Sequence, residues 1–148
     1  MHGIGTVQSI RKRSFSGPKG HRFAKIFFPR EDLVLMVREG DLEGTIQKPI
    51  EKSEARQVLE HIGDWNEVAC DEWKARASAQ QKKLDEGDVF SLAEVYKTLR
   101  LRQKSDSLSA ADRKQLSQSK QSLSEVLAVA LGRPLGKISQ HMEKAALN

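Results

Sequence analysis

The stretch Lys82-Lys-Leu-Asp-Glu-Gly-Asp-Val-Phe-Ser-Leu-Ala-Glu-Val95 decides the fold, because it joins two helical patterns across one break. Gly87 is of the type that ends a helix, and Asp88 is a favoured N-cap for the next helix. Beyond the break, apolar side chains recur at helical spacing and predict one buried stripe. Its members are Val89, Leu92, Ala93, Tyr96 and Leu99. The sequence therefore predicts two consecutive helices separated by a Gly-Asp turn.

The segment before this break, Asp71-Glu-Trp-Lys-Ala-Arg76, places a tryptophan among charged residues at the start of the first helix. A large apolar group beside cations suits a wedge for a bent or partly opened duplex. It also suits a core residue with a solvated rim, because Trp73 falls on one helical stripe with Ala77 and Leu84. From the residues alone, burial in the core is the favoured interpretation of Trp73.

Helical patterns continue on both sides of this pair. Glu51 to Ile62 carries apolar residues on one face and stops at Gly63, and Ser109-Ala-Ala-Asp112 forms a capping box that opens a helix to about Leu131. Gly132-Arg-Pro134 breaks that helix, and Leu135 to Leu147 is a weaker terminal one. The second part of the chain is predicted to be a bundle of four or five helices.

The first 49 residues have the composition of β-strands. Strands are predicted at Thr6–Ile10, Phe23–Phe28 and Leu33–Val37, with a hairpin joining the last two and one more short strand at Thr45–Pro49. Ser16-Gly-Pro-Lys-Gly20 is a turn between the first two strands. The predicted fold is α+β, with a β-rich module at residues 1–49 and an all-α domain at 50–148. So small a sheet is marginal alone.

Composition indicates a soluble, basic, intracellular protein. The chain has 148 residues and a formal net charge of +5, which favours a polyanionic partner. Cations dominate from Arg11 to Lys25 and again after Asp88, and carboxylates dominate between Pro49 and Asp88. With Cys70 as the single cysteine, no internal disulfide is expected, and no apolar run reaches the roughly 20 residues of a membrane span. A cytoplasmic location and no membrane partner follow as expectations.

Chemistry-bearing motifs are missing from the sequence. The four histidines and Cys70 lack the spacing of metal ligands, and no dinucleotide or phosphate-binding loop is present. No local pattern pairs a nucleophile with a histidine. We therefore expect no metal, no cofactor and no enzyme.

Five motifs occur along the chain: His2-Gly-Ile-Gly-Thr-Val7, Asp32-Leu-Val-Leu-Met-Val37, Trp73-Lys-Ala-Arg76, Gly87-Asp-Val-Phe-Ser-Leu-Ala-Glu-Val95 and Leu108-Ser-Ala-Ala-Asp-Arg-Lys114. In order and spacing they resemble the CarD/CdnL family of bacterial RNA polymerase-binding transcription regulators, whose N-terminal module is shared with the transcription-repair coupling factor. The last two are quite specific together. The resemblance covers nearly the whole chain.

For the first module the resemblance implies a Tudor-like β fold that binds the β subunit of RNA polymerase by adding to its sheet. On this chain the pairing edge would comprise Leu33, Val34, Leu35, Met36 and Val37, with Arg13 as a flanking charge. Free backbone groups of an edge strand make such an addition physically reasonable. The alternative is that Leu33–Val37 is an interior strand.

For the helical domain the resemblance implies contact with promoter DNA near the upstream edge of the bubble. Trp73 matches the family's wedge, and Arg76 matches the arginine three residues later. Phosphate contacts are then expected from cations of the helical domain. These are Lys74, Arg76, Lys82, Lys83, Arg100, Arg102, Arg113 and Lys114. Trp65, which has no such arginine, is predicted to pack between the two domains.

Some positions depart from the family pattern. The family's first strand is absent before His2, so either the β module is incomplete or the start has been trimmed. A truncated sheet could pair with itself in a strand-exchanged homodimer. Arg38 replaces a proline, and Ala75 and Ala77 replace an arginine and a tyrosine. The implied function is a cytoplasmic, nucleoid-associated regulator that stabilises the open promoter complex. The alternative is a polymerase-binding adaptor that has lost DNA binding.

Overall fold

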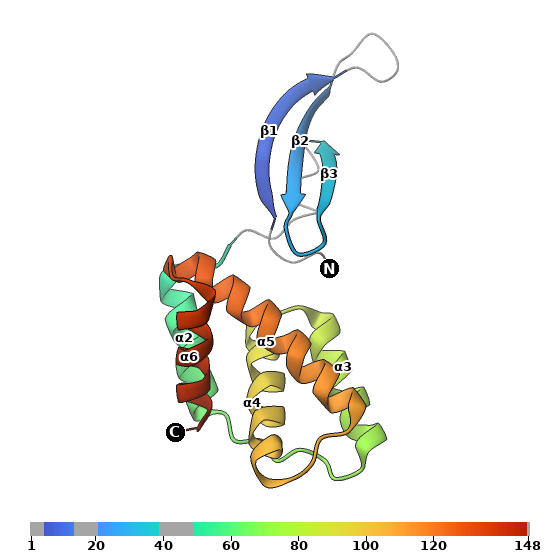
Figure 1. The fold of residues 1–148 in the computed structure, drawn as a ribbon, viewed down its shortest axis with the longest axis vertical. Helices are drawn as coiled ribbons and strands as arrows, with labels where there is room; N and C mark the ends of the chain where they lie inside the picture. The colour runs from blue at the N-terminus through green and yellow to red at the C-terminus, as the bar shows by residue number, and fades with distance from the viewer. Residues whose placement is uncertain (1–4, 14–20, 39–48, 148) are drawn as a thin grey trace. The chain divides into compact units, whose positions relative to one another are not determined.

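The computed structural model (Figure 1) describes residues 5–13, 21–38 and 49–147 and has the predicted α+β class. The described strands are β1 (Thr6–Arg13), β2 (His21–Phe28) and β3 (Leu33–Arg38). The described helices are α2 (Lys52–Asp64), α3 (Trp73–Glu86), α4 (Val89–Ser105), α5 (Ala110–Leu131) and α6 (Leu135–Leu147). The chain divides into two compact units, Met1–Pro49 and Ile50–Asn148.

The first unit contains an antiparallel sheet in the order β1-β2-β3. The predicted hairpin of β2 and β3 is confirmed, with Ile26 opposite Leu35 and Phe28 opposite Leu33. Alternation along these strands buries one set of side chains and exposes the other. The small core lies on the face of Ala24, Ile26 and Phe28. The predicted turn at 16–20 lies outside the described residues, as does nearly all of the strand predicted at 45–49.

Gly5 lies against this core where a side chain would not fit. A Cβ atom on Gly5 would come within 2.6 Å of Ile26 Cγ2 and 2.7 Å of Phe28 Cε1. These contacts are too close for any residue with a Cβ, unless the aromatic and aliphatic neighbours move. The second glycine of the His-Gly-Ile-Gly element is therefore required by packing.

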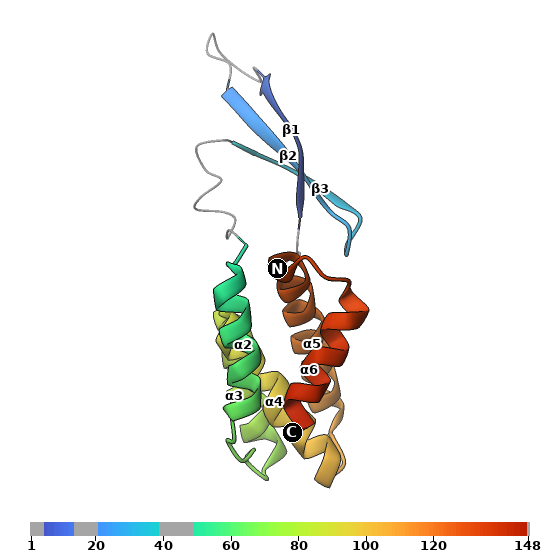
Figure 2. The ribbon, with the colours of Figure 1, turned by 90° about the vertical axis from the view of Figure 1, so that its left-hand side faces the viewer.

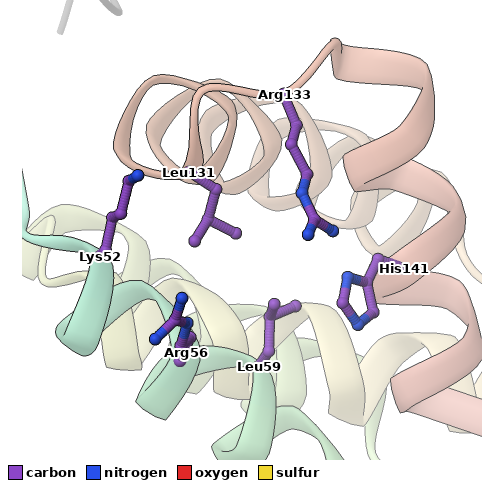
Figure 3. Close-up of a pocket in the computed structure, with 6 residues that line it drawn as sticks. All are labelled: Lys52, Arg56, Leu59, Leu131, Arg133 and His141. Atoms are coloured by element: carbon purple, nitrogen blue, oxygen red, sulfur yellow. The ribbon is translucent and has the colours of Figure 1, made fainter.

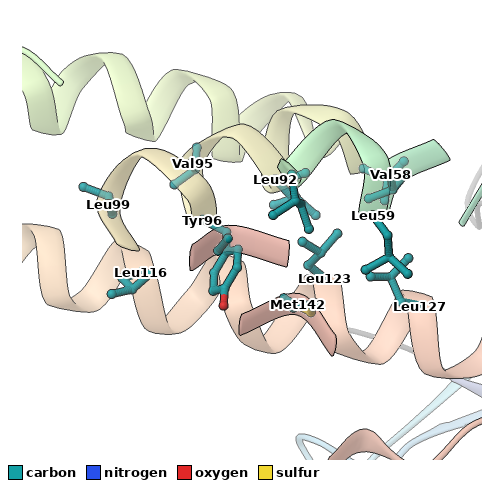
Figure 4. Close-up of a cluster of buried hydrophobic side chains, with 14 of the residues drawn as sticks. Val58, Leu59, Leu92, Val95, Tyr96, Leu99, Leu116, Leu123, Leu127 and Met142 are labelled. Atoms are coloured by element: carbon teal, nitrogen blue, oxygen red, sulfur yellow. The ribbon is translucent and has the colours of Figure 1, made fainter. Parts of the chain in front are cut away.

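The second unit is built around α4, whose apolar face contacts the other helices (Figures 2 and 4). In Figure 4, Tyr96 of α4 points toward α5, and Leu92 lies near Val58 and Leu59 of α2. All five residues of the predicted α4 stripe are buried. The views agree that α2 and α6 run side by side (Figure 2). One apolar cluster holds the helical unit together.

The helix ends follow from local chemistry. The Ser109 hydroxyl accepts the N–H of Asp112 at 3.1 Å, and the Asp112 carboxylate accepts the N–H of Ser109 at 3.0 Å, which confirms the predicted capping box. Asp88 caps α4 by accepting the Ser91 N–H at 3.2 Å. Gly87 and Gly132 follow α3 and α5 with φ of 68° and 62°, a region that favours glycine. Among the described residues, no helix has the length and apolar character needed to cross a membrane.

Candidate nucleic-acid interface

Trp73 is the first residue of α3, and 52% of its surface is exposed. Arg76, Gln80 and Leu84 form the buried stripe of α3, and Trp73 continues this stripe toward the N-terminus. The predicted alignment with Leu84 is therefore found, but the tryptophan itself is not enclosed in the core. The Lys74 ammonium lies 5.6 Å from the centre of the Trp73 ring, within the range of a cation–π contact.

Glu72 fixes the start of α3 immediately before the tryptophan. Its carboxylate accepts the backbone N–H groups of Lys74 and Ala75, at 3.0 and 2.6 Å. A carboxylate at a helix N-terminus satisfies free donors and complements the helix dipole. The exposed ring is thus attached to a capped helix end.

Arg76 is buried, contrary to the expectation that it contacts phosphate from the surface. It has 3% relative exposure, and Asp112, its partner in α5, has none. The guanidinium donates to both Asp112 oxygens, from Nε at 2.9 Å and from Nη2 at 2.7 Å. Its Nη1 donates to the carbonyl oxygens of Cys70 and Asp71, at 2.7 and 3.0 Å. These bonds join the segment before Trp73 to α5, so Arg76 holds the start of α3 in place.

Asp112 therefore has two roles, since the carboxylate that pairs with Arg76 also closes the capping box of α5. The hydrogen bonds from Arg76 hold the pKa of Asp112 below its usual range, although burial alone would raise it. The same hydrogen bond raises the pKa of Arg76. Both groups are charged at neutral pH, and each compensates the other's desolvation.

The contact between α3 and α5 is largely polar. Besides Arg76 and Asp112, it buries Gln80 and Gln115. The Gln115 side-chain amide donates to the carbonyl oxygen of Ala77 at 2.9 Å. On α3, Leu84 is the single buried apolar residue. The helix that carries Trp73 is thus held by directional bonds more than by apolar area.

The other predicted phosphate ligands fall into two groups. Exposed side chains belong to Lys74, Lys82, Arg113 and Lys114. Arg113 also donates to the Leu108 carbonyl at 3.1 Å. Because Arg113 and Lys114 follow Asp112 directly, the Arg76–Asp112 pair brings them to the end of the bundle where Trp73 lies.

The second group of cations is paired with carboxylates. Lys83 contacts Glu67 at 3.1 Å and Glu94 at 3.2 Å, and these contacts raise its pKa although burial opposes them. Arg100 donates to Glu143 at 2.6 Å. Arg102 lies 3.5 Å from Asp71. These three cations are less available to phosphate than the exposed group.

Trp65, which was predicted to pack between the two domains, has its described contacts within the helical unit. Its indole N–H donates to the Thr98 hydroxyl at 3.0 Å, and the Lys83 ammonium lies 4.8 Å from its ring centre. The His61 ring, one turn earlier, is tilted by 42° against the Trp65 ring, with 5.4 Å between ring centres. These contacts join the end of α2 to α3 and α4.

The strand predicted to bind polymerase lies at an edge of the described sheet. Within the described residues β3 pairs with β2 alone, so the interior-strand alternative does not apply to them. Leu33, Leu35 and Val37 pack on the core face, whereas Val34 and Met36 are exposed on the opposite face. The backbone of Arg13 pairs with His21 at the far end of β1, and nothing is described of its side chain.

Sequence reasoning missed the roles of Asp112 and Glu72. The capping box indicates Asp112 as a cap, but its pairing with Arg76 joins residues 36 positions apart. A weak clue exists: aspartate stands where glutamate is usual in a capping box. Glutamate is not among the residues preferred at an N-cap, so the capping role of Glu72 had no clear signal in the sequence.

A comparison with protein-family models supports the resemblance. The model described as "CarD, C-terminal domain" matches residues 57–143, which include α3, α4 and α5 in full. Within the described residues, no group of three or more potential metal ligands lies together.

Proposed function

Because this chain belongs to the CarD family of transcription regulators, we propose that it binds RNA polymerase and stabilises the open promoter complex through an exposed tryptophan. The family is non-enzymatic and implies interaction with RNA polymerase in general. Three features of this chain support the proposal: the exposed ring of Trp73, the exposed cations of the helical unit, and the position of β3 at an edge of the described sheet.

The observation that carries the proposal is the half-exposed Trp73 on a braced helix end. A wedge must be apolar enough to replace a lost base stack, exposed enough to reach it, and rigid enough not to fold away. Trp73 meets the first two conditions by its type and its exposure. The Arg76–Asp112 pair and the Glu72 cap supply the third. Lys74, Lys82, Arg113 and Lys114 would contact phosphates beside it.

In the proposed complex, β3 adds to a strand of the polymerase β subunit. The edge of β3 away from β2, which pairs with no other described strand, would supply the hydrogen bonds, and the exposed Val34 and Met36 would provide side-chain contacts. Promoter DNA near the upstream edge of the bubble is the second partner. We place this activity in the cytoplasm, at the nucleoid. The same edge could instead pair with a second copy, and sedimentation of the free protein distinguishes a monomer from such a strand-exchanged homodimer.

The test is the lifetime of open complexes formed by purified polymerase. Base–aromatic stacking is worth about 1–3 kcal/mol, so Trp73→Ala should shorten the lifetime at least about fivefold. The matched control is Val68→Ala, since Val68 is an apolar residue of the same unit with 89% exposure. A lifetime unchanged by Trp73→Ala, or shortened equally by the control, contradicts the wedge.

A polymerase-binding adaptor without DNA affinity is a second candidate, favoured by the charges around the ring. Asp71 and Glu72 directly precede Trp73, Arg76 is buried, and Ala75 and Ala77 offer no donors. A salt titration separates the two functions, because affinity for DNA falls steeply with salt when several phosphates are neutralised. Binding to polymerase with no DNA binding at low salt would favour the adaptor.

A further inference from the structure

A second basic site lies away from Trp73, in a hollow between α2, the end of α5 and α6 (Figure 3). The hollow has a volume of about 190 Å³. Its lining consists of Lys52, Arg56, Leu59, Leu131, Arg133 and His141. Figure 3 shows Arg133 and Arg56 directed toward the space from opposite sides, with Leu59 and Leu131 between them.

The polar lining of this hollow is entirely basic. Lys52, Arg56, Arg133 and His141 line it, and none of the lining residues is a carboxylate. In the part of the chain that the structure describes, none of these four side chains has a carboxylate partner, unlike Arg100 or Lys83. Several uncompensated cations around one concavity raise the local potential for an anion.

Two helix N-termini add to this potential. Lys52 is the first residue of α2, and its N-cap Glu51 makes no side-chain capping bond. Arg133 lies two residues before Leu135, the first residue of α6. The ends of helices bear partial positive charge and free N–H groups, which favour anions. Because Glu51 and Glu54 place carboxylates at the start of α2, the case for an anion depends mainly on the basic side chains that line the hollow.

The size of the hollow limits the ligand. Pockets for drug-sized molecules measure roughly 300–1,000 Å³, so 190 Å³ suits a small group. Arginine forks match the oxygens of phosphate, and two arginines from different elements line this hollow. We propose that this hollow binds a single phosphate group, clamped between Arg56 and Arg133, with Lys52 and His141 as further donors.

The site is separate from the proposed wedge. Asp112, which braces Trp73, lies in the first turn of α5, and Leu131 is its last residue. The 22 residues of α5 separate these ends by roughly 30 Å. The proposal therefore goes beyond the proposed function. His141 is the one aromatic side chain among the lining residues, and no Phe, Tyr or Trp lines the hollow, so the proposal concerns the phosphate group alone.

The first experiment titrates the full chain, labelled with ¹⁵N, with inorganic phosphate. We expect saturable shifts of the Arg56 and Arg133 side-chain N–H signals. Arg56→Gln and Arg133→Gln should each weaken binding about tenfold, as for loss of one charge-assisted hydrogen bond. Both side chains are exposed, so these changes leave the core intact. Lys104→Gln is the matched control, because it removes an exposed cation from α4 outside the hollow.

The second experiment identifies the source of the phosphate by adding a short DNA duplex. If the duplex displaces inorganic phosphate, and Arg56→Gln and Arg133→Gln each lower the salt dependence of DNA binding by about one released ion, the group belongs to the nucleic-acid backbone. If phosphate binds and DNA does not displace it, the ligand is a small free phosphate. The absence of saturable shifts with both ligands, or equal weakening by Lys104→Gln, would overturn the site. The Trp73→Ala variant should bind phosphate normally, so the two proposals can fail separately.

Discussion

At the scale of single residues, Arg76 and Asp112 matter most, because their buried ion pair joins the start of α3 to the start of α5. The family resemblance implies Arg76 as a DNA contact, but the structure uses it to hold Asp112 and two carbonyl groups. A sequence pattern cannot anticipate this, since the partner lies 36 residues away. By contrast, the N-cap role of Asp88 and the capping box at Ser109 depend on neighbours within three residues, and both were predictable.

Removal of one partner should be costly. Arg76→Ala leaves the buried Asp112 carboxylate unpaired and should lower the free energy of unfolding by about 3–5 kcal/mol. Denaturant titration measures the change. Lys82→Ala, on the exposed face of the same helix, is the control and should cost less than about 0.5 kcal/mol. Equal effects of the two changes would show that the pair contributes little.

The pair also predicts a dependence on pH. The pKa of Asp112 is lowered in the folded state, mainly by hydrogen bonds from Arg76. Its contribution is therefore complete above the unfolded pKa of about 3.9 and is lost as pH falls through the lower folded value. Asp112→Asn should be less stable than the parent protein at neutral pH, and the difference should shrink below about pH 4. Denaturation curves recorded across this range test it, and a constant difference would contradict it.

At the scale of elements, the helices with a clear apolar periodicity agree best with the prediction from sequence. All five residues of the α4 stripe are buried, and α5 begins and ends where its capping box and Gly132 predict. The buried face of α3 was harder to predict, because it contains Arg76 and Gln80, which a hydrophobic pattern does not detect. The exposure of Trp73 was not predictable from periodicity either. Its alignment with Leu84 favours burial, but Trp73 is the first residue of α3 and lies beyond the buried part of the stripe.

Because α3 is held mainly by polar contacts, it should unfold locally more easily than the other helices of the unit. Helices with little buried apolar area unfold locally at lower free energy than core helices. We expect backbone amides in the middle of α3 to exchange with solvent at least about tenfold faster than those of α4, a difference of about 1.4 kcal/mol. Native-state hydrogen exchange measures both helices in one sample. Equal protection would show that the polar contacts match the apolar core in strength.

At the scale of the whole molecule, the two compact units differ in the size of their apolar cores. The helical unit has one apolar cluster to which all five helices from α2 to α6 contribute, whereas the sheet core consists of three buried residues with partly buried neighbours. Small sheets with thin cores are marginal alone. The sequence predicted this asymmetry from the number and length of the strands.

Separate expression of the units should expose the difference. A fragment of residues 50–148 should keep its helical circular dichroism and unfold cooperatively, because all members of its apolar cluster lie within it. A fragment of residues 1–49 should show no cooperative thermal transition. Thermal melts of the two fragments provide the measurement. A cooperative transition in the shorter fragment, or none in the longer one, would contradict this division of stability.

The contrasting surroundings of Trp65 and Trp73 give the protein two optical reporters. Trp65 is hydrogen-bonded to Thr98 and lies beneath a lysine, whereas half of Trp73 faces solvent. Fluorescence of a Trp65→Phe variant would therefore come from the ring at the tip of α3 and respond to ligands there. Emission from Trp73→Phe would follow the integrity of the bundle, so docking and unfolding can be recorded in separate channels without a dye.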